Sequence, residues 1–144
     1  MALCQQQCET LQRQIRSAEI RSFSSHGRVE CWQAKPLWDA VLSNVRVAVA
    51  TYAVLQNALS DGFVKMDSTA LIVFDEAHNR VGKSPGSKIM HDFYWPDKDA
   101  GRDVPRIMGM TASPTNKTGG AKLKKLEETL NSTCKSPQMH RENL

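Results

Sequence analysis

The stretch that decides the fold is ALIVFDEAH, residues 70 to 78. It starts as a short apolar run with β-branched residues and ends abruptly at two neighbouring carboxylates, Asp75 and Glu76. A run of this kind is typical of a strand buried in a parallel sheet. Because ligands of open α/β sheets bind beyond the carboxyl ends of the strands, the pattern predicts that both carboxylates lie at a binding edge.

The segments on either side of this stretch alternate between helix and strand. Periodicity, proline and capping residues predict helices at residues 2–17, 36–42, 51–59, 89–95 and 121–130. Strands are expected at residues 18–23, 45–50, 70–74 and 106–110, with polar loops at 80–88 and 97–103. This alternation predicts an α/β fold in which a mostly parallel sheet carries helices on both faces.

Three of these strands end in polar groups, which are Thr51, the Asp75-Glu76 pair, and Thr111 with Ser113. An aspartate at a strand end can hold Mg²⁺ through water beside nucleotide phosphates, and the next glutamate can act as general base for water. His78 and the two hydroxyls can then contact the acidic pair. The plainer alternatives are a strand followed by a polar loop, and helix capping by the hydroxyls.

One stretch imitates a phosphate-binding loop. Residues 77–84, AHNRVGKS, fit a permissive form of that motif, with Lys83 in the place of its lysine. A phosphate cradle depends on exposed backbone N–H groups at glycines, and Gly82 is the only glycine in this stretch. The two carboxylates beside it would repel phosphates. We therefore expect Lys83 to be a solvated loop residue or a contact to a nucleic-acid backbone.

Composition narrows the class of protein without fixing its function. The chain has 144 residues, enough for one domain, and its formal net charge of +4 is compatible with a nucleic-acid partner without requiring one. No apolar run approaches the roughly 20 residues of a membrane helix, and the amino terminus has no secretory pattern, so a cytoplasmic or nuclear location is expected. The four cysteines have no metal-binding spacing and are expected to be free thiols. Trp32 and Trp38 could stack on nucleic-acid bases, but the sequence favours packing roles for them. His26, His91 and His140 are expected to have surface or packing roles.

The order DEAH, strand, TAS resembles motifs II and III of superfamily 2 helicases. The stretches VRVAVATYAVLQNALSDGFVKMDSTALIVFDEAHN, GKSPGSKIMHDFY and PRIMGMTASP resemble the amino-terminal helicase domain of fungal-type Dicer-like ribonucleases. Innate-immune RNA sensors and DNA-repair helicases are more distant relatives. The resemblance implies a RecA-like P-loop NTPase fold with three α/β/α layers. It also implies that residues 1–144 run from motif Ia to just beyond motif III of the first RecA-like domain.

The resemblance also implies roles for individual residues. Asp75 would bind the magnesium of ATP, Glu76 would activate water, and His78 with Thr111 and Ser113 would couple hydrolysis to movement. Gln6, within the tail of motif Ia, and Thr51, in motif Ib, would contact the nucleic-acid backbone. The implied cofactors are ATP and Mg²⁺, the implied partner is double-stranded RNA, and the implied role is RNA silencing with antiviral defence.

The sequence departs from the family at its start. The P-loop strand precedes motif Ia in the family, so we expect an incomplete fold without that strand: a fragment, a truncated gene model or a decayed copy. The second RecA-like domain with its arginine finger and the ribonuclease domains would belong to the complete protein. We therefore expect the chain alone to hydrolyse little ATP. The alternatives are a non-catalytic module that binds nucleic acid or protein, and a relative of DNA-repair helicases.

Overall fold

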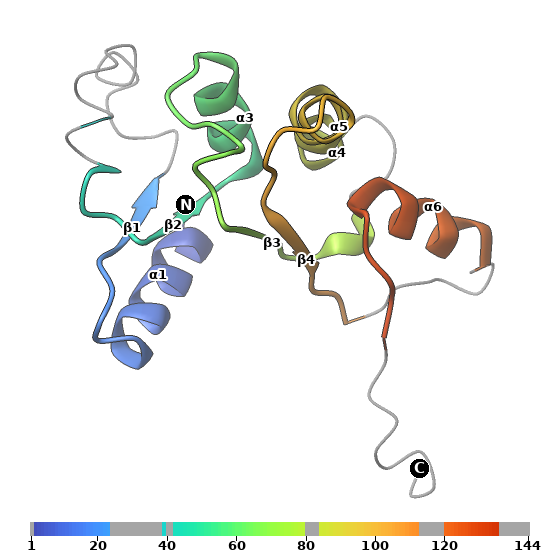
Figure 1. Cartoon of the computed structure of the whole chain (residues 1–144). Helices are drawn as coiled ribbons and strands as arrows, with labels where there is room; N and C mark the ends of the chain where they lie inside the picture. Colours follow the sequence, from blue (N-terminus) through green and yellow to red (C-terminus); the bar gives the residue numbers. More distant parts are fainter. Residues whose placement is uncertain (1, 24–38, 40–41, 80–83, 113–119, 136–144) are drawn as a thin grey trace, which may run out of the picture. The chain divides into compact units, whose positions relative to one another are not determined.

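The computed structural model describes residues 2–23, 39, 42–79, 84–112 and 120–135 (Figure 1). The chain divides into two compact units, Met1–Ser68 and Thr69–Leu144. In the described residues each unit contains one two-stranded parallel sheet, β1 with β2 and β3 with β4. The parallel pairing that the alternation of helices and strands predicts is therefore confirmed within each unit.

The amino-terminal unit packs helix α1 (Ala2–Gln14) against strands β1 (Ile20–Phe23) and β2 (Val47–Ala50). Gln12 Nε2 donates to the Ile20 carbonyl at 2.8 Å, and the buried thiol of Cys8 lies 3.8 Å from the same oxygen. These contacts attach α1 to β1, the first strand of the sheet.

A second helix of this unit, α3 (Tyr52–Ser60), follows β2 directly. Thr51 caps it, since its side chain accepts the Val54 N–H at 3.4 Å, and Gly62 follows the helix with φ +69°, a left-handed conformation favourable to glycine. The helix predicted at residues 51–59 is thus confirmed. The core of this unit contains Phe23 and Ala58, with half-buried partners Leu42, Val45, Ala50, Val54, Phe63 and Val64.

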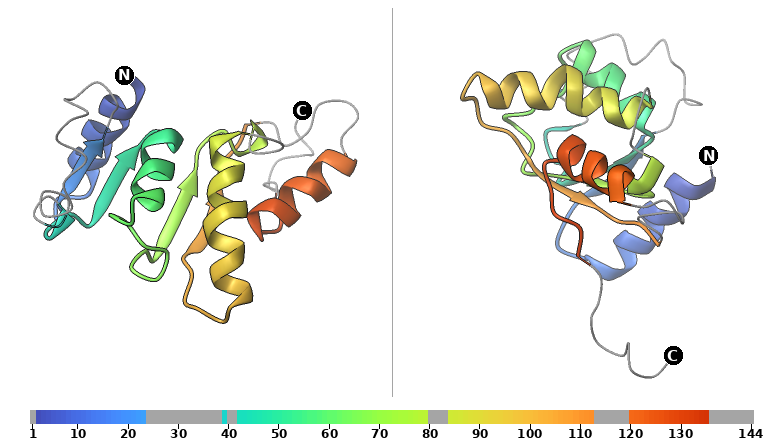
Figure 2. Two further views of the ribbon diagram at one scale, coloured as in Figure 1. Left: turned by 90° about the horizontal axis from the view of Figure 1, so that it is seen from above. Right: turned by 90° about the vertical axis from the view of Figure 1, so that its right-hand side faces the viewer.

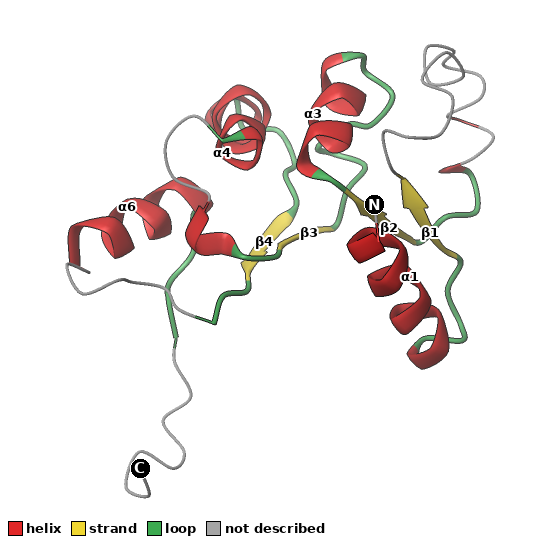
Figure 3. Cartoon of the chain, turned by 180° about the vertical axis from the view of Figure 1, so that it is seen from behind, coloured by secondary structure: helices red, strands yellow, loops and turns green. Residues whose placement is uncertain are grey.

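The carboxy-terminal unit places β3 (Leu71–Phe74) beside β4 (Arg106–Gly109), with Leu71 opposite Arg106 and Phe74 opposite Gly109. Helix α6 (Gly120–Leu130) lies against β4 (Figure 3). The side chains on one face of the sheet, among them Ile72 and Phe74, are buried with others from the helices: Ile89, Met90, Tyr94, Leu126 and Leu130. On the opposite face, Leu71, Val73 and Met108 are 44–50% exposed.

One continuous helical segment connects the two strands of this unit, and Figure 2 shows it as a single rod. It consists of α4 (Pro85–Ile89), the π-helical turn η3 (Met90–Tyr94) and α5 (Trp95–Asp99). Within it, the Trp95 N–H donates to the Met90 carbonyl, one residue further back than in an α-helix. Pro96 explains the wider turn, because it cannot donate a hydrogen bond and its ring would clash with the carbonyl four residues earlier.

This segment corrects two predictions. The helix predicted at residues 89–95 is confirmed, but residues 85–88 and 97–99, for which the sequence predicts loops, also form helix. The helix starts earlier because the Ser84 side chain accepts the Ser87 N–H at 3.2 Å and Pro85 occupies the first turn, where proline is tolerated. At its other end, Pro96 lies in the first turn of α5, so it does not stop the helix.

Several smaller expectations can also be compared with the structure. Most of the helix expected at residues 36–42 lies outside the described residues, and α1 ends at Gln14 rather than at residue 17. Cys4, Cys8 and Cys134 are free thiols, as predicted, and Cys31 lies outside the described residues. No helix in the described part of the chain has the length and apolar character to cross a membrane.

Candidate functional site

The acidic pair lies at the carboxyl end of β3, where the sequence predicts it. Phe74 is fully buried and anchors the end of the strand, Asp75 is half-buried, and the Glu76 side chain is 56% exposed. Asp75 Oδ1 accepts the backbone N–H of Glu76 at 2.9 Å. A buried apolar strand therefore presents two neighbouring carboxylates at its end.

The backbone turns at Glu76, whose φ is +48°. This left-handed conformation is uncommon for a residue other than glycine, and it leads into the short 3₁₀ turn η2 (Ala77–Asn79). The turn allows the Ala77 N–H to donate to the Met110 carbonyl at 2.8 Å, while the Met110 N–H donates to the Phe74 carbonyl at 2.8 Å. Hydrogen bonding between the two chain segments thus continues past the ends of the strands and brings Thr111 to the acidic turn.

His78 contacts both Glu76 and Thr111. Its Nδ1 lies 2.8 Å from Thr111 Oγ1 and 3.2 Å from Glu76 Oε2. A carboxylate only accepts hydrogen bonds, so the contact with Glu76 favours the ring form that carries hydrogen on Nδ1. The structure therefore brings three of the predicted site residues into one polar group, which we call the acidic-turn group: Glu76, His78 and Thr111.

Ala77, which lies within the acidic turn, packs closely against Gly109. Ala77, between Glu76 and His78, is 2% exposed. A Cβ atom added to Gly109 would lie 2.9 Å from the Ala77 Cβ and 3.2 Å from Leu130 Cδ1. The sequence predicts Gly109 only as part of the strand at residues 106–110. The signal that could have found this contact is a glycine inside an apolar strand, which often marks a close approach of two backbones.

The two predicted nucleic-acid contacts lie in the amino-terminal unit. Thr51 caps α3, and its hydroxyl is engaged with the Val54 N–H. Gln6 is exposed on α1, and its carbonyl accepts the Thr10 hydroxyl at 2.9 Å. His91 is exposed and lies 2.7 Å from Asp92 Oδ1. The other residues singled out from the sequence lie outside the described residues: Ser113, Lys83, Trp32, Trp38, His26 and His140.

The donor set at the end of β3 consists of carboxylates and forms no enclosed metal site within the described residues. In the described part of the chain, no three or more His, Cys, Asp or Glu side chains gather in a way that could hold a metal. A dedicated protein cage is therefore not formed by these residues. One strand-end carboxylate, Asp75, instead fits Mg²⁺, which keeps several waters and takes further oxygen ligands from phosphates.

Comparison with known proteins gives a consistent result along the whole chain. The chain is 48% identical over 144 residues to Dicer-like protein 2 of Pyricularia oryzae and 44% identical over 144 residues to that of Neurospora crassa. It is 42% identical over 146 aligned residues to Dicer-like protein 2-1 of Aspergillus niger. The chain resembles the helicase region of fungal Dicer-like proteins throughout. All of the chain is matched in each case, but it spans only 9–10% of the length of these relatives.

A solved structure has a similar fold. The crystal structure of the Pyrococcus furiosus Hef helicase domain superposes with a TM-score of 0.69, at 22% identity, over 91% of this chain and 25% of that one. A likeness at this identity concerns the fold, and it confirms the expected RecA-like α/β class, of which this chain holds an incomplete part. No protein-family model matches the chain.

Proposed function

We propose that this chain forms the magnesium-binding and water-activating part of an ATP-dependent RNA helicase or translocase domain in a Dicer-like protein. The observation that carries the proposal is the acidic-turn group beside Asp75, in which His78 Nδ1 contacts both Glu76 and Thr111. Two strand ends, β3 and β4, contribute to this group. The domain would correspond to motif Ia through motif III of a first RecA-like domain.

Bound Mg²⁺-ATP would supply the phosphoryl group and the positive charge beside it. Asp75 would hold the ion through water from the end of β3, a position that the buried Phe74 side chain fixes. Glu76, whose side chain is half-exposed, would orient the attacking water and accept its proton. The contact at 3.2 Å between His78 Nδ1 and Glu76 Oε2 would limit the rotation of that carboxylate.

His78 could also couple ATP hydrolysis to movement of the helicase. When Glu76 accepts a proton, its negative charge is lost, and its attraction for an Nδ1–H group weakens. The hydrogen bond of His78 would then shift toward Thr111 Oγ1, which is 2.8 Å away at the end of β4. Ser113, two residues further along, would join this response, as the helicase resemblance implies.

The proposed nucleic-acid partner is double-stranded RNA. Thr51 lies at the amino terminus of α3, where backbone N–H groups and the helix dipole favour a phosphate, and Gln6 offers an exposed amide on α1. The similarity to Dicer-like proteins supports RNA over DNA. The complete protein would add a second RecA-like domain and ribonuclease domains, and would act in RNA silencing and antiviral defence in the cytoplasm or nucleus.

The decisive experiment is Glu76→Gln in a full-length Dicer-like protein that carries this segment. The substitution keeps the shape of the side chain but removes the base, so we expect RNA-stimulated ATP turnover to fall by about 10²-fold or more while ATP binding persists. Glu128→Gln, which changes an exposed acid on α6 of the same unit, is the matched control. Unchanged turnover in Glu76→Gln would remove Glu76 from the mechanism, and stronger stimulation by forked DNA than by duplex RNA would favour a DNA-repair role.

A second candidate function is a non-catalytic module that binds nucleic acid or protein. The observation in its favour is that these 144 residues contain no convincing glycine-rich phosphate cradle. Titration of this chain with Mg²⁺-ATP tests this candidate, because it shows whether the chain alone binds and hydrolyses ATP. Tight binding with hydrolysis would contradict the non-catalytic function and would restore residues 77–84 as a phosphate-binding loop.

A further inference from the structure

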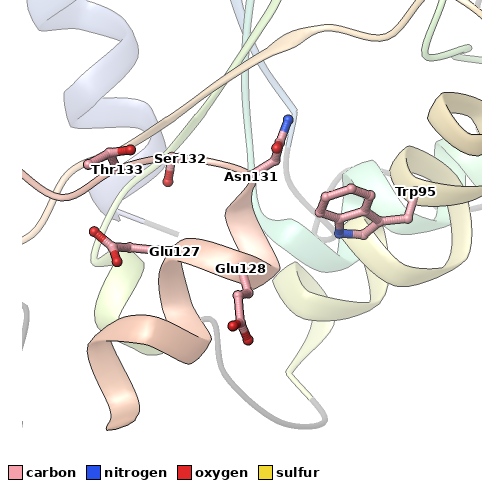
Figure 4. A pocket seen from close by; sticks show the side chains of 6 residues that line it. All are labelled: Trp95, Glu127, Glu128, Asn131, Ser132 and Thr133. Atoms are coloured by element: carbon pink, nitrogen blue, oxygen red, sulfur yellow. The ribbon is translucent and has the colours of Figure 1, made fainter. Parts of the chain in front are cut away.

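The carboxyl end of α6 is held by two aromatic residues at the π-helical turn. Tyr94 is 3% exposed and its hydroxyl oxygen accepts a hydrogen bond from Asn131 Nδ2 at 2.8 Å. The Trp95 indole N–H donates to the Thr129 carbonyl at 3.2 Å, and the Tyr94 and Trp95 rings meet edge to face with centroids 5.5 Å apart. Trp95 and residues at the end of α6 line an open pocket of about 600 Å³. Figure 4 shows these side chains.

Asn131 has the backbone conformation needed for this contact. Its φ is +48°, the left-handed conformation that commonly ends a helix and that asparagine tolerates better than most residues. Its N–H still donates to the Glu128 carbonyl at 3.3 Å, so the main chain stays attached to the last turn of α6 while the side chain reaches Tyr94. The Tyr94–Asn131 bond therefore fixes the residue directly after Leu130.

Leu130 connects the end of α6, which the Tyr94–Asn131 bond fixes, to the acidic turn. It is 1% exposed, and its Cδ1 would lie 3.2 Å from a Cβ on Gly109, which in turn would lie 2.9 Å from the Ala77 Cβ. Leu130, Gly109 and Ala77 thus pack in succession, and Ala77 is the residue between Glu76 and His78. Protein interiors are close-packed, so a displacement of Leu130 changes the space available to Ala77.

From this chain of contacts we infer that Tyr94 and Asn131 are positioning residues for the acidic-turn group and act through Leu130. The π-helical turn before Pro96 sets the direction of Tyr94 toward α6. The kinetic consequence rests on the proposed function, whereas the structural consequence does not. Two kinds of measurement therefore separate failure of this inference from failure of the proposed function.

The structural test uses Tyr94→Phe, which removes one hydroxyl, in this chain. We expect the Ala77 amide, bonded to the Met110 carbonyl, to exchange its hydrogen about fivefold faster, the size expected for loss of one hydrogen bond. Asn131→Gly keeps the left-handed conformation, removes the Nδ2 donor and should have the same effect. Thr129→Ala is the control, because it removes a hydroxyl bonded to the Lys125 carbonyl within the same helix and should leave Ala77 unchanged.

The route through Leu130 is tested with paired substitutions. In a Leu130→Val background, Tyr94→Phe should no longer accelerate exchange at Ala77, because the connecting side chain has been shortened. An undiminished effect of Tyr94→Phe in that background would overturn the inference, as would no effect in the original background. Equal acceleration at Ala77 and at the Ile72 amide in the core strand would also overturn it, since that result indicates general loosening.

The kinetic test uses the full-length protein. Tyr94→Phe should lower kcat for RNA-stimulated ATP hydrolysis by about fivefold, with KM for ATP unchanged, since the hydroxyl acts on the geometry of the turn and not on nucleotide binding. A raised KM with constant kcat would contradict positioning. If Glu76→Gln leaves turnover unchanged, the proposed function fails, but exchange at Ala77 still decides whether Tyr94 positions the turn.

Discussion

The turns after β2 and β3 follow similar strands but adopt different structures. Each follows a four-residue parallel strand, and each begins with a side chain suited to phosphate or metal chemistry. After β2, Thr51 is extended with φ −72° and its side chain caps the next helix. After β3, Glu76 is left-handed with φ +48°, and the nearby His78 contacts Thr111, which lies 33 residues further along the chain.

The difference shows that the turn after one strand can be defined by local contacts and the turn after another by contacts distant in sequence. The Thr51 turn is defined by residues within four positions of each other, so its hydroxyl serves structure first. The Glu76 turn is closed by β4 and α6, and it keeps exposed polar side chains in a backbone conformation that carries a cost. Conformations of this kind are concentrated at functional sites, which agrees with the role proposed for the second turn.

The largest expected effect comes from closing the space that the second turn needs. Gly109→Ala places a methyl group 2.9 Å from the Ala77 Cβ and 3.2 Å from Leu130 Cδ1, so we expect a loss of about 1–3 kcal/mol in the free energy of unfolding. Urea denaturation measures it. Gly120→Ala is the matched control, because a Cβ there meets no atom within 4 Å. Equal stability of both variants would show that Ala77 and Leu130 adjust freely around Gly109.

A smaller effect is expected at the first turn. Thr51→Ala removes the oxygen that accepts the Val54 N–H, and loss of such a cap typically costs about 1 kcal/mol. Thr51→Ser retains the oxygen and should stay close to the original stability in the same urea assay. If the alanine and serine variants had equal free energies of unfolding, the capping contact would contribute nothing to stability. The contrast between the two turns would then not extend to stability.

The smallest effect has the opposite sign. Glu76→Gly relieves the left-handed strain at φ +48° but adds freedom to the unfolded chain, so we expect a net gain of about 0.5 kcal/mol in unfolding free energy. Thermal unfolding can detect the gain. Glu76→Ala also lacks the carboxylate but keeps a Cβ, so it should show no gain. A stability of the glycine variant below that of the alanine variant would mean that Glu76 is not strained.

Features of the fold that depend on neighbouring residues can be predicted from the sequence. The strand at residues 71–74, its acidic end and the Thr51 cap depend on neighbouring residues, and the structure shows each of them. The start of α4 is not predicted, because Ser84 and Pro85 are common in loops as well as at helix starts. The packing of Ala77 against Gly109 cannot be predicted either, because the sequence does not show which backbone segments approach closely.

The π-helical turn at Met90–Tyr94 has a consequence for how this segment tolerates changes in length. An α-helix has 3.6 residues per turn, so deleting one residue before Trp95 would rotate every later helical side chain by about 100°. In the shortened helix the Pro96 ring would meet the carbonyl four residues earlier, and Trp95 would turn away from the Thr129 carbonyl that it now contacts. In this segment the number of residues matters as much as their identity.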